Sequence, residues 1–271
     1  MDPTAQALAR TYSDREYPDP WEKVLDYRGV QAYAAEHSKH GRTRVGKALN
    51  LPPSRVRGWL NGGMPDPVRG IQTAIDYGWL DPTPDSDTTA ALVELFAHVL
   101  AGGSITAKTF VPAVATGSRV DRGDVRTAFA RVGVDTIVRH GDTDGRATEV
   151  LPAANASVLG RCLVAMGAPA GEKVYADAFP PVVWDVPKAV RVSFARIYVA
   201  HRATMFADKR TMAVQEERSL AYLEGLCEFL ADVTGESVTV SNHSVTISAD
   251  AARELYPADY SISSAAISPA E

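Results

Sequence analysis

Arginine and lysine side chains are concentrated between residues 39 and 70 of this sequence. That stretch holds seven basic residues against a single acid, Asp66, although the chain of 271 residues carries a net charge of −5. A local excess of positive charge attracts a polyanion, and guanidinium groups bind phosphate oxygens and base edges through paired hydrogen bonds. The chemistry that these residues favour is therefore nucleic-acid binding.

Two short helices joined by a tight turn at residues 51–53 are expected to position these cations. The first helix, residues 42–50, is amphipathic, with Val45, Ala48 and Leu49 turned inward. The two prolines of the turn end it, because proline cannot continue the helical hydrogen-bond pattern.

The second helix is expected to begin at a cap on Ser54 and to end at residues 61–63. Val56, Trp59 and Leu60 follow at helical spacing and face the core. A short capped helix with arginines near its N-terminus suits base reading in a major groove, and the preceding helix suits phosphate contact. The residues predicted to contact DNA in this helix-turn-helix are Arg42, Arg44, Lys47, Ser54, Arg55 and Arg57. A basic helical hairpin with a solvated face is the alternative interpretation.

The division into domains is predicted from composition. Residues 81–88 contain two prolines and three acids and lack apolar side chains, which is typical of a linker. The predicted parts are an irregular N-terminal arm at 1–28, a helix-turn-helix domain at 29–80, a linker at 81–90, an α/β (α+β) domain at 91–257 and a tail at 258–271.

The order helix, strands, helix, hairpin, helix is predicted to occur twice, about a hundred residues apart. Two copies of one unit indicate a pseudo-two-fold domain, with repeat one at residues 91–168 and repeat two at 187–257. The predicted helices are 91–100, 121–132, 157–166, 187–200, 217–233 and 249–256. The predicted strands are 104–116, 134–139, 146–150 and 204–214, with a hairpin at 238–248 that turns at Asn242 and His243.

Four segments between Leu92 and Tyr256 resemble a two-repeat LAGLIDADG homing endonuclease. Residues 92–105 are similar to the family's first motif, an apolar helix that ends in Gly-Asp-Gly-Ser-Ile. Residues 153–173 resemble the family's "lGvp-gkK" segment, and residues 179–184 resemble its Pro-rich crossover. Residues 194–204 are similar to the second motif, "FLRGLFDADGS".

The resemblance implies two motif helices side by side, each delivering one acid to a shared divalent-metal site over the scissile phosphates. Gly102 and Arg202 occupy those two positions here, and the neighbouring Ala101 and Ala200 supply no carboxylate. Mg²⁺ then lacks its hard oxygen ligands, and a cation at the site repels it. We therefore expect no catalytic residue, metal, cofactor or cleavage, while Arg202 could instead contact phosphate.

The resemblance also implies two antiparallel sheets that form a saddle over a DNA duplex. The candidates for DNA contact on the predicted strands and turns are Lys108, Arg119, Arg122, Arg139, His140, Arg146, Lys209 and Arg210. The uncharged hairpin at residues 237–248 offers Thr239, Ser241, Asn242, His243 and Thr246. These neutral side chains either read bases by hydrogen bonds or do not touch DNA.

Two pairs of side chains could suggest metal sites but are assigned structural roles. His98 and His201 lie on the two motif helices, and no Cys, Asp or Glu at matching spacing completes a zinc site around them. Cys162 and Cys227 lie in separate apolar helices and are expected to be small buried hydrophobic residues.

Together these patterns predict a sequence-specific double-stranded DNA-binding protein, a transcriptional regulator derived from a homing endonuclease that has lost its nuclease activity. No apolar run reaches the length of a membrane span, so we expect a cytoplasmic, nucleoid-associated protein without a membrane partner. One chain holds both repeats, so binding as a monomer is expected. A bacterial regulator family that joins a degenerate LAGLIDADG domain to a helix-turn-helix, in the reverse order, is an architectural precedent.

Two alternatives remain open. One is an active or nicking nuclease with displaced acids, for example Glu94 or Asp208, although Glu94 lies about 12 Å along its helix from the motif end. The other is a protein-interaction module, because residues 211–271 hold ten acids against two basic residues and could dock a protein partner. In that interpretation Glu216 and Glu217 belong to an acidic C-terminal face.

Overall fold

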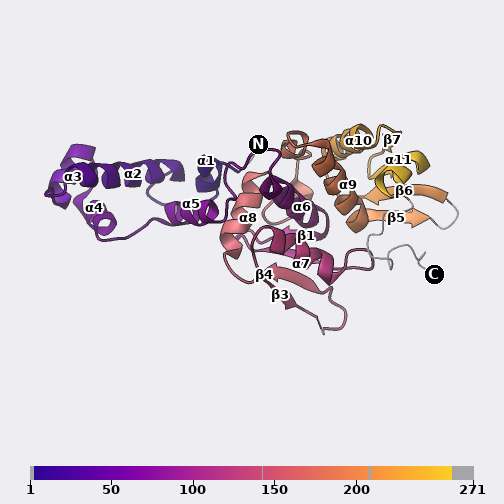
Figure 1. Cartoon of the computed structure of the whole chain (residues 1–271), viewed down its shortest axis with the longest axis horizontal. Coiled ribbons are helices and arrows are strands. Elements are labelled where there is room, and N and C mark those ends of the chain that lie inside the picture. The colour runs from indigo at the N-terminus through magenta and orange to yellow at the C-terminus, as the bar shows by residue number, and fades with distance from the viewer. Residues whose placement is uncertain (1–2, 142, 207–208, 258–271) are drawn as a thin grey trace.

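The computed structural model describes residues 3–141, 143–206 and 209–257 (Figure 1). Within these residues the chain folds into helices and two four-stranded antiparallel sheets, which is the expected α+β class. None of the helices described is long and apolar enough to cross a membrane.

Two helices begin within residues 3–28, so the expectation of an irregular arm at 1–28 is wrong. Helix α1 (Ala5–Arg10) is capped by the hydroxyl of Thr4, and α2 (Pro20–Glu36) by the carboxylate of Asp19. Proline at the first position of α2 costs no hydrogen bond, because that N–H has no partner within a helix. The remaining helices of this region are α3 (Arg42–Leu49), α4 (Pro53–Leu60) and α5 (Asp66–Asp76).

Helices α3 and α4 form a tip with its own hydrophobic cluster. Val30, Val45, Val56 and Trp59 make this cluster, separate from the main core. Helix α2, with 17 residues, is roughly 25 Å long at 1.5 Å per residue. It therefore carries the tip away from the sheets, as Figure 1 shows at the end of the molecule opposite β5 and β6.

The other end of the N-terminal region is part of the main core. Leu8, Ile71 and Trp79 are buried in that core, and the Trp79 indole donates a 2.9 Å hydrogen bond to the carbonyl of Val132. The Arg161 guanidinium lies between the rings of Tyr12 and Phe110, 3.9 and 3.8 Å from their centres. The hydrophobic core therefore continues across the predicted linker at residues 81–88.

The two halves of the sheet-containing region repeat one order of elements. The first half consists of α6 (Asp87–Gly102), β1 (Gly103–Ile105), β2 (Pro112–Ala115), α7 (Arg122–Arg131), β3 (Thr136–Arg139), β4 (Glu149–Pro152) and α8 (Ala156–Ala165). The second consists of α9 (Lys188–Arg202), β5 (Ala203–Phe206), β6 (Lys209–Gln215), α10 (Leu220–Thr234), β7 (Val238–Val240), β8 (Ser244–Ile247) and α11 (Ala249–Leu255). The sheet orders, β1-β2-β4-β3 and β5-β6-β8-β7, correspond strand for strand, so the predicted repeat is confirmed.

Two predicted strands are in fact hairpins. The stretch 104–116 divides into β1 and β2, and 204–214 divides into β5 and β6, each pair antiparallel. In the first stretch, β-branched residues continue through the turn at 106–111, so the pattern alone does not mark that reversal. Strand β4 also lies about three residues beyond the range expected at 146–150. Asp121 and Asp124 form a capping box at the start of α7.

Helices α6 and α9 pack against each other between the two sheets. The rings of Phe96 and Phe194 meet there with centres 6.2 Å apart. Ala97 and Ala195 are fully buried, and such small side chains let two backbones approach closely. The two helices end side by side, which brings residues about a hundred positions apart into one site.

Each sheet has one face covered by helices and one open face. On the covered faces Val114, Val150, Val214 and Val245 are fully buried. The open face of the second sheet carries a row in which Thr204 pairs with Ala213, Ala213 with Thr246 and Thr246 with Thr239.

Candidate nucleic-acid interface

The α3–α4 pair depends on a close approach at its turn. A β-carbon on Gly46 would lie 2.6 Å from the carbonyl oxygen of Leu51, so only glycine fits there. Asn50 ends α3 in the left-handed conformation, with φ of 55°. Gly46 is thus the residue that allows the tight turn between α3 and α4.

Helix α4 begins earlier than predicted. Pro52 is its N-cap residue and Pro53 its first helical residue. The prediction that Ser54 caps the helix is therefore wrong, and Ser54 lies in the first turn with an exposed side chain. Ala48, predicted to point inward, is also exposed. Trp59 is buried, as expected.

Four of the predicted DNA-contacting cations share the exposed surface of the tip: Arg42, Arg44, Lys47 and Arg57. Within the part of the chain that the structure describes, none of the four forms an ion pair. Their charges are therefore available to a ligand.

Arg55, the fifth predicted cation of the tip, is held by the protein itself. One terminal nitrogen of Arg55 donates to the hydroxyl of Tyr17 and the other to the carboxylate of Glu16, each at 2.7 Å. Tyr17 in turn donates a 2.7 Å hydrogen bond to Asp26 on α2. The Arg55 side chain is 21% exposed. It joins α4 to the loop between α1 and α2, and it is not the freely outward residue that the helical spacing predicted.

The sheet hairpins carry most of the remaining predicted cations. Lys108 is exposed in the β1–β2 loop, and Arg210 is exposed in β6, which follows the equivalent turn of the second half. Arg146 is exposed in the β3–β4 loop, and Arg122 is exposed at the start of α7. Lys209 starts β6, but its side chain lies outside the described residues.

Three of the predicted residues have partners inside the protein. Arg119 donates to the carbonyl of Ala203, which links the two halves, and burial lowers its pKa. Arg139 is paired with Glu149 on the neighbouring strand, with a nitrogen–oxygen distance of 2.6 Å, and the His140 ring lies 4.0 Å from the same carboxylate.

The open faces of the sheets are mostly neutral. Thr204, Thr239 and Thr246 are exposed on the second sheet. Ile137 is 55% exposed on the first sheet and pairs with Leu151. The predicted cations of this region that form no ion pair within the described part of the chain therefore lie at or beside the hairpins and at the start of α7.

At the paired ends of α6 and α9, His201 covers Gly102. A β-carbon on Gly102 would lie 2.1 Å from Nδ1 of His201. The other ring nitrogen, Nε2, lies 2.9 Å from Nδ1 of His98. Burial lowers the pKa of His98 to about 4, and burial and then His98 lower the pKa of His201 to about 3. Both rings are neutral in the folded protein at pH 7, as expected for structural histidines.

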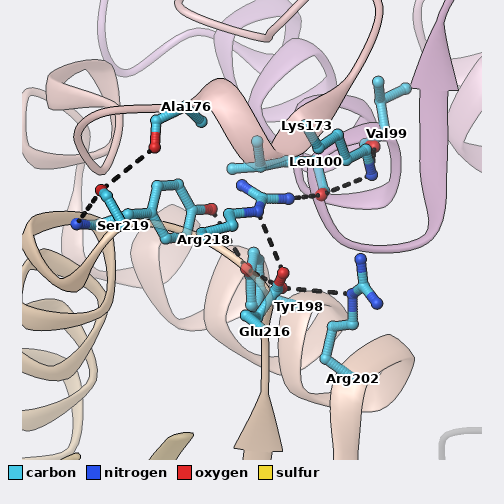
Figure 2. Close-up of polar contacts among 10 residues, drawn as sticks. Val99, Leu100, Lys173, Ala176, Tyr198, Arg202, Glu216, Arg218 and Ser219 are labelled. Atoms are coloured by element: carbon cyan, nitrogen blue, oxygen red, sulfur yellow. Dashed lines mark hydrogen bonds and ion pairs between the residues drawn. The ribbon is translucent and has the colours of Figure 1, made fainter. Parts of the chain in front are cut away.

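Three cations and a buried carboxylate surround these helix ends (Figure 2). Nε of Arg218 lies 3.1 Å from Glu216, and Nε of Arg202 lies 3.3 Å from it on another side. Tyr198 donates its hydroxyl to the same carboxylate. Glu216 is thus buried and neutralised by two guanidinium groups. The expectation that it lies on an acidic outer face is wrong, whereas Glu217 is exposed.

Lys173 completes this group from the short 3-10 helix η1 (Lys173–Tyr175) in the crossover between the halves. Its ammonium donates to the carbonyls of Val99 and Leu100 at 2.9 and 2.8 Å, and Arg218 donates to Leu100 at 2.7 Å. Cations are favoured here because the last carbonyls of a helix carry partial negative charge.

Two cavities adjoin at this group of cations. The larger, of about 660 Å³, is lined by Gln215 and Ser244 of the second sheet. The smaller, of about 490 Å³, is lined by Ser104 and Ala115 of the first sheet. Lys173 and Arg202 line both cavities, so they lie between the two sheets.

The displaced acids considered for nuclease activity have different positions. Glu94 forms an ion pair with Arg131 of α7, so its carboxylate points away from the helix ends. Asp208 lies outside the described residues. Cys162 is fully buried, and burial raises its pKa to about 12, while Cys227 is half-buried; both are free thiols.

The sequence pattern predicts no site that contains Lys173, Glu216 and Arg218. The one sequence signal for Lys173 is its place at the end of a segment that resembles the family, and this signal alone predicts no function for the side chain. Glu216 and Arg218 follow β6, where charged residues normally indicate a surface loop. In the folded chain Tyr198 and Arg202 of α9 contact Glu216, and Arg218 reaches the carbonyl of Leu100 at the end of α6.

No protein-family model matches this sequence, and a comparison with curated proteins gives no match. The resemblance to LAGLIDADG endonucleases therefore rests on the motifs and on the order of the elements.

Proposed function

We propose that this chain is a sequence-specific double-stranded DNA-binding protein that binds through the α3–α4 tip and the open sides of the two sheets. The observation that carries the proposal is the set of exposed cations on the tip, Arg42, Arg44, Lys47 and Arg57, without ion-pair partners in the described part of the chain. A compact helix pair with such a surface has the form of a helix-turn-helix, with α4 as the helix for the major groove.

The two repeated halves support a second area of contact. In the LAGLIDADG arrangement that this chain resembles, two sheets straddle the duplex and their exposed side chains face the major groove. The threonines of the second sheet offer hydroxyl groups to base edges and methyl groups to thymine. Lys108, Arg146 and Arg210 on the hairpins would lie near the DNA backbone.

We further propose that the protein regulates transcription and does not cleave DNA. Gly102 supplies no carboxylate at the end of α6, and Arg202 supplies a cation at the end of α9. Glu216, the buried acid at this place, is already bound by Arg202, Arg218 and Tyr198. A carboxylate so neutralised is a poor ligand for Mg²⁺.

Selection of bound sequences from a random duplex library, with Mg²⁺ present and the products run on a denaturing gel, tests these proposals. We expect a consensus of roughly 20 base pairs, largely non-palindromic because one chain binds it, recovered uncut. Cleaved products would show a nuclease with displaced acids. Recovery of no consensus would overturn the DNA-binding proposal and favour a protein partner.

Variants of the tip then test whether its arginines contact the DNA. Arg57→Ala and Arg44→Ala should each weaken binding to the selected duplex, and each should reduce the slope of log affinity against log salt by about one if the side chain meets a phosphate. Arg126→Ala, an exposed arginine on α7, is the matched control and should change neither quantity. Equal behaviour of all three variants would place the DNA elsewhere.

A further inference from the structure

The group of cations between the two sheets has hydrogen-bond donors that the protein does not use. Arg202 directs Nε toward Glu216, and its side chain is 36% exposed. Its two terminal nitrogens point away from that carboxylate in Figure 2 and have no hydrogen-bond partner among the described residues. Lys173 uses two of its three ammonium protons on the carbonyls of α6.

Positive charge exceeds negative charge inside this site. Lys173, Arg202 and Arg218 share one buried carboxylate, Glu216, while Glu217 is exposed at the rim. The pKa of Lys173 is lowered to about 7, first by burial and then by Arg218 and Arg202, and Glu216 offsets this only in part. Such a site favours an anionic ligand that removes the repulsion.

The cavities determine where an anion would lie. Both are lined by Lys173 and Arg202, and the larger also by His243, Gln215 and Ser244, whose polar groups can complete the hydrogen bonds of a tetrahedral anion. Guanidinium groups bind phosphate with two parallel hydrogen bonds, and two terminal nitrogens of Arg202 are available for this. A volume of about 660 Å³ admits a phosphate together with the sugar attached to it.

We propose that Lys173 and Arg202 form a phosphate-binding site between the two sheets, in which protein cations take the place of a metal ion. The inference rests on the proposed function in one respect, that the phosphate is a backbone phosphate of the bound duplex. A free phosphate is the other source of the same chemistry, and the two arms of the experiment distinguish them.

The first arm uses the protein without DNA and millimolar sulfate as the probe. The thermal midpoint should rise and saturate with sulfate, relative to chloride at equal ionic strength, for the natural protein and for the control Arg126→Gln. It should not saturate for Arg202→Gln, where only the general effect of sulfate on protein stability remains. Arg202→Lys, which keeps the charge, should recover part of the response.

The second arm uses the selected duplex. Arg202→Gln should weaken its binding about tenfold, the value of one charge-assisted hydrogen-bonded contact, and reduce the salt slope by about one. Lys173→Gln should have the same direction of effect. Arg202→Gln is the main variant because Glu216 keeps Arg218 and Tyr198 as partners, and circular dichroism verifies that it folds.

The outcomes separate the two proposals. If the natural protein binds the duplex but Arg202→Gln matches Arg126→Gln in both arms, the phosphate site is overturned and the DNA-binding proposal stands. If the natural protein binds no duplex but sulfate saturates at Arg202, the DNA-binding proposal fails and the site is assigned to a free phosphate. A response to Arg202→Gln in both arms supports the backbone phosphate.

Discussion

The pair formed by His98 and His201 shows how single residues join the two halves. Nδ1 of His98 and Nε2 of His201 are 2.9 Å apart, so one ring donates its proton to the other. The nitrogen that accepts this hydrogen bond must be unprotonated, and burial of both rings disfavours a positive charge on either ring. No group of three or more His, Cys, Asp or Glu residues that could hold a metal occurs among the residues described.

The pKa values of these histidines predict a loss of stability in acid. The ordinary value of 6.5 falls to about 4 for His98 and about 3 for His201 in the folded protein, so the unfolded chain binds more protons below pH 6.5. Their contribution is complete above pH 6.5 and declines as the pH falls toward 4. At pH 5 the free energy of unfolding should be lower than at pH 7.5 by about 2 kcal/mol per histidine, at 1.36 kcal/mol per pKa unit.

Urea unfolding at the two pH values measures this difference. His98→Gln keeps a hydrogen-bonding side chain but does not titrate, so it should show a smaller difference between pH 7.5 and pH 5. An equal difference in the natural protein and the variant would mean that other groups cause the acid sensitivity.

At the scale of elements, the two helical glycines of the α3–α4 pair differ in the space around them. Gly46 lies against the carbonyl of Leu51, whereas a β-carbon on Gly58 would meet nothing within 4 Å. Both positions are helical, so sequence propensity treats them alike. Only the packing of the turn distinguishes the required glycine from the replaceable one.

This difference predicts opposite effects of one substitution. Gly58→Ala should stabilise the tip by about 0.5–1 kcal/mol, the ordinary gain of alanine in a helix. Gly46→Ala should destabilise it by about 1–3 kcal/mol, because the turn must move away. Hydrogen exchange of the amides in α3 and α4 reports on the tip, whose hydrophobic cluster is separate from the main core. Loss of protection in both variants would show that Gly58 is also constrained.

At the scale of the whole molecule, the connection between the N-terminal helices and the sheets determines how the tip and the sheets act together. Helices α1 and α5 pack on α8, and Arg161 of α8 lies between the rings of Tyr12 and Phe110. Arg161 also donates to the carbonyl of Thr11. These contacts join the base of the N-terminal region to the sheet-containing region. In the proposed DNA complex, this connection would favour one spacing between the two DNA segments.

Arg161→Ala should loosen this connection. Cation–π contacts contribute roughly 0.5–2 kcal/mol each, and the hydrogen bonds to Thr11 are lost as well. We expect faster hydrogen exchange in α1 and easier proteolysis between α1 and α2, with exchange in β2, β4, β6 and β8 unchanged. Arg126→Ala is the matched control. Uniform loosening of the sheets in Arg161→Ala would contradict the local role.

The sequence by itself determined the class of fold, the repeat and three of the four residues in the hydrophobic cluster of the tip, because these depend on local patterns. Hydrophobic spacing placed Val45, Val56 and Trp59 correctly. The recurrence of one order of elements predicted two equivalent sheets, which the topology confirms. Positions of strand reversal and of the α4 cap were missed, since neighbouring residues there allow more than one boundary.

Only the tertiary structure decided which charges are free and which are used. Arg55 and Glu216 both have the sequence pattern of surface residues, yet Arg55 is bound by Glu16 and Tyr17, and Glu216 is buried between two arginines. Lys173 joins that group from a crossover more than seventy residues from Val99, whose carbonyl it binds. A charge acquires its partner from the packing of distant elements, and no local spacing encodes that distance.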